Sequence, residues 1–181
     1  MRSFISLNIS SRAKREIKTI CDGLKKKIRT NAQVRYDNPD NYHITLFFIG
    51  EINEGSLKKI YDVLNERLSG RFGELNFVCE DYGGFPNLKN PRVIFLDSRN
   101  IENKIFEIAA VVDGVLSEYG FPRDKKFHPH ITLARIKSRI DLEKLSNEKV
   151  DVNFSVSKIS IMQSIISTKG AEHKEIFAIN L

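Results

Sequence analysis

The sequence predicts an α+β fold of two pseudo-symmetric lobes, each of mainly antiparallel sheet with helices outside. The tetrapeptide His-Ile-Thr-Leu occurs twice, at His43–Leu46 and at His130–Leu133, with the β-branched and apolar residues of buried strands. Similar strands and helices flank each copy, which indicates an internal duplication. Strands dominate, and the helices do not alternate strictly with them, which favours antiparallel pairing. We therefore expect one bilobal domain over residues 1–181, with approximate halves 1–90 and 91–181 and a cleft between the two His-x-Thr strands.

Hydrophobic periodicity predicts the elements of the first half in chain order. Apolar residues at helical spacing, with Lys and Arg on the opposite face, predict a helix that carries Ala13 to Ile28 and a second from about Glu54 to Leu68. Ser10 can cap the first of these helices. Residues rich in β-branched and apolar side chains predict strands at residues 3–9, 33–36, 43–50 and 74–81.

A Gly- and Pro-rich segment at residues 83–91 is the clearest break in the chain, and the order of elements then repeats. Apolar residues at helical spacing from Ile101 to Leu116 predict a helix, and a short one is expected near 142–145. A basic loop precedes the second His strand. Besides that strand, we expect strands at residues 92–97, 150–156, 159–166 and 176–179.

Composition indicates an ordinary globular protein, with 41% apolar and 29% charged residues. The net charge of +6 favours anionic partners, first of all nucleic acid or phosphorylated small molecules. Cys21 and Cys79 form no CxxC pair, which argues against a disulfide framework or a thiolate metal site and fits a reducing compartment. Residues 4–9 are too short and too polar for a signal-peptide core, and no segment approaches the ~20 apolar residues of a membrane span. We expect a cytoplasmic monomer that does not associate with membranes.

The two His-x-Thr pairs indicate acid–base chemistry. Residues i and i+2 of a strand share a face, so His43 lies beside Thr45 and His130 beside Thr132. Two imidazoles facing one cleft can act as a base that takes a proton from water and an acid that protonates a leaving oxygen. Each hydroxyl can hold an anionic oxygen or fix an imidazole tautomer. These groups suit the opening of a strained cyclic phosphodiester, and we expect neither a metal nor a cofactor.

At these residues the sequence resembles the two-histidine (2H) phosphoesterases. It is most similar to the LigT-like RNA 2′,3′-cyclic phosphodiesterases, also called 2′-5′ RNA ligases. The resemblance extends over essentially the whole chain, and includes the N-terminal residues 1–5 and the segments 48–51, 84–86, 91–93, 132–135 and 164–170. It differs at Phe95-Leu96, near which the family usually has Trp, and at His173, a place often held by Tyr.

This resemblance implies an enzyme, a phosphoric diester hydrolase that converts RNA 2′,3′-cyclic phosphate ends to 2′-phosphate ends without a metal. RNA ends or nucleoside 2′,3′-cyclic phosphates would be its substrates. It implies His43 as the acid at the leaving O3′ and His130 as the base for water, although the sequence itself does not order the two. Thr45 and Thr132 would hydrogen-bond the phosphate, and Arg135 would stabilise its charge.

Three alternative functions stay open at this point. The same site could act in the reverse direction as a 2′-5′ RNA ligase. The chain could instead be an RNA-end or nucleotide-binding module with little turnover, although a binder needs no pair of titrating groups. His128 and His130 also form a His-x-His pair, which is a plausible metal pair for a metal-dependent hydrolase. No convincing third ligand is near them in the sequence.

Four further predictions concern residues around the motifs. Strict alternation puts Arg135 on the face opposite His130, so it reaches the site only if the strand bends, bulges or ends there. Phe48, which follows its His by the same five residues, is expected in the core rather than stacked on a base. His173 is expected to be exposed in a polar C-terminal turn. The basic loop residues could contact RNA phosphates or form a solvated loop, and these are Arg123, Lys125 and Lys126.

Overall fold

One open, mostly antiparallel sheet of ten strands forms the frame of the computed structural model, which describes residues 1–28, 32–168 and 170–181. The strand order is β10-β9-β1-β3-β7-β5-β4-β6, with β2 paired to β7 and β8 paired to β4. The predicted α+β class with antiparallel pairing is therefore confirmed. The strands are β1 Arg2–Asn8, β2 Val34–Tyr36, β3 His43–Glu51, β4 Leu75–Phe85, β5 Val93–Asp97, β6 Arg99–Asn100, β7 His130–Ile136, β8 Lys149–Val156, β9 Lys158–Ser167 and β10 Gly170–Asn180.

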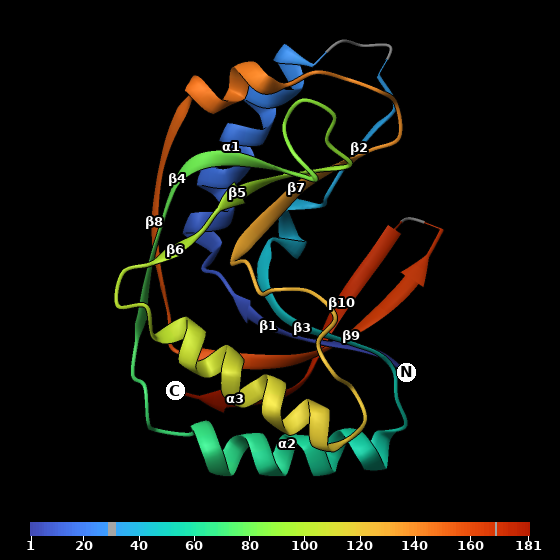
Figure 1. Cartoon of the computed structure of the whole chain (residues 1–181), viewed down its shortest axis with the longest axis vertical. Helices are drawn as coiled ribbons and strands as arrows, with labels where there is room; N and C mark the ends of the chain where they lie inside the picture. The colour runs from blue at the N-terminus through green and yellow to red at the C-terminus, as the bar shows by residue number, and fades with distance from the viewer. Residues whose placement is uncertain (29–31, 169) are drawn as a thin grey trace.

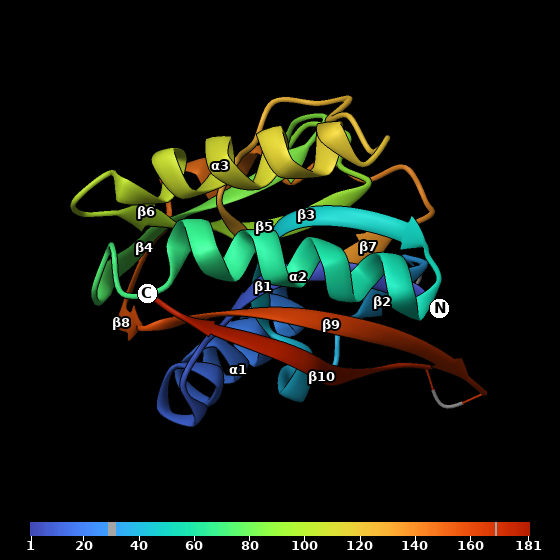
Figure 2. The ribbon, with the colours of Figure 1, turned by 90° about the horizontal axis from the view of Figure 1, so that it is seen from below.

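The sheet divides into two lobes that meet between β3 and β7 (Figure 1). Helices α2 (Glu54–Leu68) and α3 (Lys104–Glu118) pack against each other and contact β10 and β3, respectively. Helix α1 (Ser11–Lys27) belongs to the other lobe, where it contacts β8. Figure 2 shows α1 on the opposite side of the molecule from α3. Each lobe thus combines elements that are distant in the chain. In one lobe the C-terminal β9 and β10 join β1 and β3, and in the other β8 pairs with β4 and contacts α1. The internal duplication with halves 1–90 and 91–181 stays a prediction.

Local sequence explains where the helices begin. The Ser10 hydroxyl accepts a hydrogen bond from the N–H of Ala13 at 3.2 Å, as the sequence predicts for a capping residue. The Asn53 side chain caps α2 in the same way, by accepting from the N–H of Ser56 at 2.8 Å. Helix α2 has the predicted bounds, whereas α3 begins at Lys104, three residues later than expected from Ile101. None of the helices in the described ranges is long and apolar enough to cross a membrane.

The predicted break at residues 83–91 is part of a β-hairpin instead. Strand β4 continues to Phe85 and pairs with β5, with Gly83 opposite Phe95. A Cβ on Gly83 would lie 2.1 Å from Cε2 of Phe95, so this glycine marks a close approach of a ring to the backbone. Two short 3₁₀ segments occur at Pro39–Asn41, just before β3, and at Glu143–Asn147, in the place of the predicted short helix.

Candidate active site

The two His-x-Thr strands are neighbours in the sheet, where Ile44 of β3 lies opposite Ile131 of β7. Both isoleucines are fully buried. In this antiparallel register the flanking residues also face each other, which puts His43 across from Thr132 and Thr45 across from His130. Because these four alternate with buried residues, they share the opposite, partly exposed face of the sheet. The structure therefore brings both predicted motifs together at the junction of the lobes.

The two imidazoles are oriented in the same way. Nδ1 of His43 lies 2.6 Å from the carbonyl oxygen of Asn41, and Nδ1 of His130 lies 2.6 Å from that of His128. A carbonyl only accepts, so each Nδ1–H donates, and a neutral ring keeps its lone pair on Nε2. The Thr45 hydroxyl is 2.9 Å from Nε2 of His43 and donates to it in this tautomer. Both rings can thus exchange a proton through Nε2.

Burial sets the protonation state of both rings. It lowers the pKa of His43 to about 4, against the opposing effect of the Asn41 carbonyl. Burial also lowers the pKa of His130, where the His128 carbonyl acts in the opposite direction. Without a bound anion, both imidazoles are therefore neutral at pH 7. A negatively charged ligand beside them would raise both pKa values and favour a proton on one of the rings.

A β-bulge brings Arg135 to the histidine face. In the pairing of β7 with β5, Thr132 lies opposite Phe95 and Ala134 opposite Ile94, which leaves Leu133 as the extra residue. Leu133 and Ala134 are both buried, so the alternation of faces changes there. The exposed Arg135 consequently lies on the side of His130 and Thr132, and its charge contributes to lowering the pKa of His130.

Strand β3 contains the equivalent bulge, and the prediction for Phe48 was wrong because of it. Thr45 lies opposite Ser6 and Phe47 opposite Ile5, so Leu46 is the extra residue. Phe48 is 68% exposed rather than in the core. Its ring centroid is 6.0 Å from that of Phe4, which in turn lies 5.1 Å from the His43 ring. The five-residue spacing shared with Arg135 is the sequence signal that could have identified this position.

His173 also lies elsewhere than predicted, in strand β10 rather than in an exposed turn. Its ring is perpendicular to that of His43, at 5.5 Å between centroids, and its Nδ1 is buried without a hydrogen-bond partner in the described parts of the chain. The Asn41 amide donates to the Ala171 carbonyl at 2.7 Å and so links β10 to the start of β3. His173 therefore forms one wall of the site.

Aromatic rings enclose His130 on the other side of the site. The centroids of Phe95 and Phe85 lie 4.9 and 5.1 Å from the His130 ring. Nε2 of the neighbouring His128 lies 3.2 Å from a carboxylate oxygen of Asp97. Among the described residues, no group of three His, Cys, Asp or Glu side chains is arranged to hold a metal ion.

The basic loop before β7 divides into a structural and a solvated part. Arg123 donates to both carboxylate oxygens of Asp113 at 2.7 Å and to the carbonyl of Leu46 at 2.7 Å. Its guanidinium also lies over the Phe47 ring, 4.9 Å from the centroid. Arg123 thus fastens the loop to α3 and β3 and is not free for a phosphate, whereas Lys125 and Lys126 are exposed.

Solved structures share this fold over the whole chain. A Thermus thermophilus protein superposes with a TM-score of 0.80 at 24% identity, covering 100% of this chain and 98% of that one. Escherichia coli LigT, crystallised with 3′-AMP, superposes with a TM-score of 0.79 at 19% identity, covering 99% and 97%. These likenesses show the fold, in which the two His-x-Thr strands β3 and β7 lie side by side.

The chain belongs to the family of LigT-like phosphoesterases, whose model matches residues 7–95 and 96–170. A relative from Aeropyrum pernix is 34% identical over 158 residues, which cover 83% of this chain and 88% of the relative. A relative from Thermotoga maritima is 28% identical over 180 residues, which cover 98% and 94%. Both relatives are named RNA 2′,3′-cyclic phosphodiesterase.

Proposed function

We propose that this chain is an RNA 2′,3′-cyclic phosphodiesterase that opens the cyclic phosphate to a 2′-phosphate end. The observation that carries this proposal is the pair of equivalently oriented imidazoles of His43 and His130, each with Nε2 as its proton-exchanging atom. Water attacks phosphorus, the P–O3′ bond breaks, one imidazole takes the proton from water, and the other gives a proton to O3′. The relatives from Aeropyrum pernix and Thermotoga maritima, which have this name, support the assignment.

The other site residues have supporting roles in this proposal. With substrate bound, the Thr45 hydroxyl turns from Nε2 of His43 to a non-bridging phosphate oxygen, and the Thr132 hydroxyl donates to another, since both lie beside the imidazoles on the same face. Arg135, which the bulge turns toward them, stabilises the charge that develops on phosphorus oxygens in the transition state. The exposed ring of Phe48 offers a surface on which a nucleobase can stack. No cofactor or metal enters the proposed reaction.

The test is to incubate the protein with EDTA and an RNA oligonucleotide that ends in a 2′,3′-cyclic phosphate. We expect a 2′-phosphate end as the product. His43→Gln and His130→Gln should each lose at least ~100-fold in turnover, since each removes one general acid–base group. His128→Gln is the matched control, because it removes a neighbouring imidazole whose ring is outside the proposed pair and should retain most of the activity.

Three outcomes would contradict this proposal. These are an unchanged cyclic end, activity that EDTA abolishes, or a folded single histidine variant with wild-type turnover. The same assay with a 5′-hydroxyl RNA added tests the ligase alternative, which requires joined product. Tight binding without turnover would favour the binding-module alternative.

The cellular setting is also part of this proposal. Both cysteines are buried and free, which supports a reducing compartment such as the cytoplasm. We propose that the chain acts as a monomer, since all the residues assigned to the reaction come from one chain. Size-exclusion chromatography with light scattering tests this, and a dimer at micromolar concentration would contradict it.

A further inference from the structure

A row of basic side chains leads away from the site along β2 and the end of β7. Arg35 of β2 lies directly opposite Arg135 of β7, and both are exposed. The pairing continues beyond the strand ends, where the N–H of Lys137 donates to the carbonyl of Gln33 at 2.9 Å. Lys137 and Arg139 are exposed, and the intervening residues are buried or partly buried. We call these four side chains, Arg35, Arg135, Lys137 and Arg139, the basic strip.

The charge of the basic strip is largely uncompensated. Many other Lys and Arg side chains form ion pairs, such as Arg12 with Glu16 and Lys149 with Asp81. Within the described ranges, no residue of the basic strip has a carboxylate within salt-bridge distance. Burial raises the pKa of Asp37, and the charges of Arg135 and Arg35 oppose this rise without a salt bridge to either. A surface of unpaired cations attracts a polyanion more strongly than a surface whose cations are in ion pairs.

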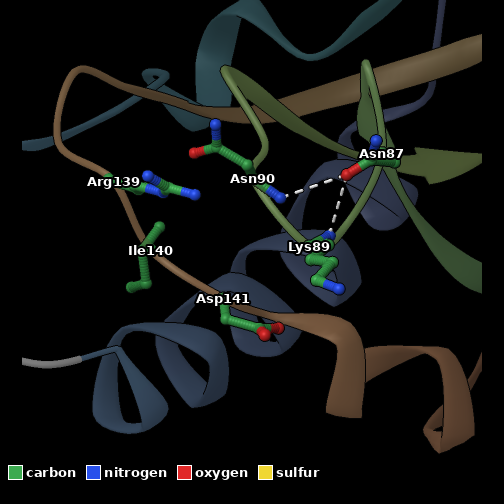
Figure 3. Close-up of a pocket in the computed structure, with 6 residues that line it drawn as sticks. All are labelled: Asn87, Lys89, Asn90, Arg139, Ile140 and Asp141. Atoms are coloured by element: carbon green, nitrogen blue, oxygen red, sulfur yellow. Dashed lines mark hydrogen bonds between the residues drawn. The ribbon is translucent and has the colours of Figure 1, made fainter.

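The basic strip ends at a hollow of about 320 Å³ between the β4–β5 hairpin and the segment after β7 (Figure 3). Two of its lining side chains, Lys89 and Arg139, are cationic, and Asp141 is the one carboxylate among them. The Asn87 side chain holds the hairpin by accepting from the N–H groups of Lys89 and Asn90, both at 3.1 Å. A positively charged depression thus lies at the end of the row of charges.

We propose that the RNA chain leaves the site along the basic strip and that the protein acts on RNA ends in preference to mononucleotides. This inference rests on the proposed function. A nucleotide with a 2′,3′-cyclic phosphate extends only from its 5′ side, so the remaining chain leaves the cleft in one direction. From Arg135 to Arg139 the backbone spans at most ~14 Å, which is longer than one nucleotide. On the other side of the histidines the rings of Phe4 and Phe48 carry no charge, and the cation whose charge reaches His43 there, Lys14, donates its Nζ to the Asp40 carbonyl.

The test compares two substrates and two variants of equal charge. The first variant is Lys137→Gln/Arg139→Gln, which leaves Arg135 and its neighbour Arg35 intact. The matched control is Lys59→Gln/Arg71→Gln, which removes one Lys and one Arg on and just after α2, in the other lobe; neither is in a salt bridge within the described residues. The substrates are a short RNA oligonucleotide ending in 2′,3′-cyclic phosphate and a nucleoside 2′,3′-cyclic phosphate.

We expect the basic-strip variant to lose about tenfold in kcat/KM on the oligonucleotide, a loss that corresponds to about 1.4 kcal/mol. Its kcat/KM on the nucleoside substrate should equal that of the wild type. A single-stranded substrate releases about 0.7 counterion per phosphate contact, and the basic-strip variant lacks two such contacts. On the oligonucleotide, its slope of log kcat/KM against log salt should therefore be less negative than that of the wild type by about 1.4. The control variant should match the wild type on both substrates and at every salt concentration.

The outcomes separate this inference from the proposed function. If the wild type hydrolyses neither substrate, the proposed function fails. If it hydrolyses both, but the basic-strip and control variants have equal kcat/KM on the oligonucleotide and equal salt slopes, the path along the basic strip is refuted and the hydrolysis stands. Equal losses on both substrates would also refute it, because they would place Lys137 or Arg139 at the reacting nucleotide.

Discussion

Burial of His43 makes a quantitative prediction about stability in acid. The pKa of this imidazole is about 4 in the folded chain and 6.5 when it is solvated. Between these two pH values the unfolded chain therefore binds more protons than the folded chain. The stability that the neutral His43 contributes is present in full above pH 6.5 and is lost as the pH falls toward 4. Linkage gives a loss from this one group of about 2 kcal/mol between pH 7 and pH 5, and about 3 kcal/mol by pH 4.

The perturbation is His43→Gln, which removes the titrating group and keeps a polar side chain. Between pH 7 and pH 5, the free energy of unfolding should decrease by about 2 kcal/mol less in the variant than in the wild type. This difference does not depend on the stability of the variant at pH 7. Urea unfolding at several pH values measures this difference by linear extrapolation. His128→Gln is the control, because it removes a neighbouring imidazole that is 44% exposed. Equal acid losses in the wild type and His43→Gln would refute the reasoning.

Three further predictions concern catalysis and packing. Because burial lowers the pKa of both His43 and His130, the optimum of kcat/KM should lie below pH 6.5; an optimum above pH 7 would count against this. The variant lacking the acid should recover more activity than the variant lacking the base on a nucleotide aryl phosphodiester, whose leaving group needs no proton; equal recovery would argue against separate roles. Gly83→Ala should cost about 1–3 kcal/mol on urea unfolding and reduce turnover, because its Cβ displaces the Phe95 ring beside His130. Gly114→Ala, in open space on α3, should stabilise by up to ~1 kcal/mol, and equal effects of the two would contradict the packing argument.

The sequence by itself determined the elements and the two motifs. Helix α2 has its predicted bounds, and the first His strand begins as expected, because hydrophobic periodicity and capping are local properties of the chain. The period of two in a strand also placed each His beside its Thr without any knowledge of neighbouring strands. These local rules were enough to indicate a two-histidine site and its chemistry.

Tertiary structure decided which other residues reach that site. Arg135 and Phe48 change faces at bulges, and a bulge depends on the register with a partner strand that is distant in sequence. His173 contacts His43 because β10 is linked to the start of β3, a relation that no local pattern contains. The alignment of Arg35 with Arg135 likewise arises from the pairing of β2 with β7. Strand register is set by the packing of the whole sheet, so residue spacing alone could not determine these neighbours.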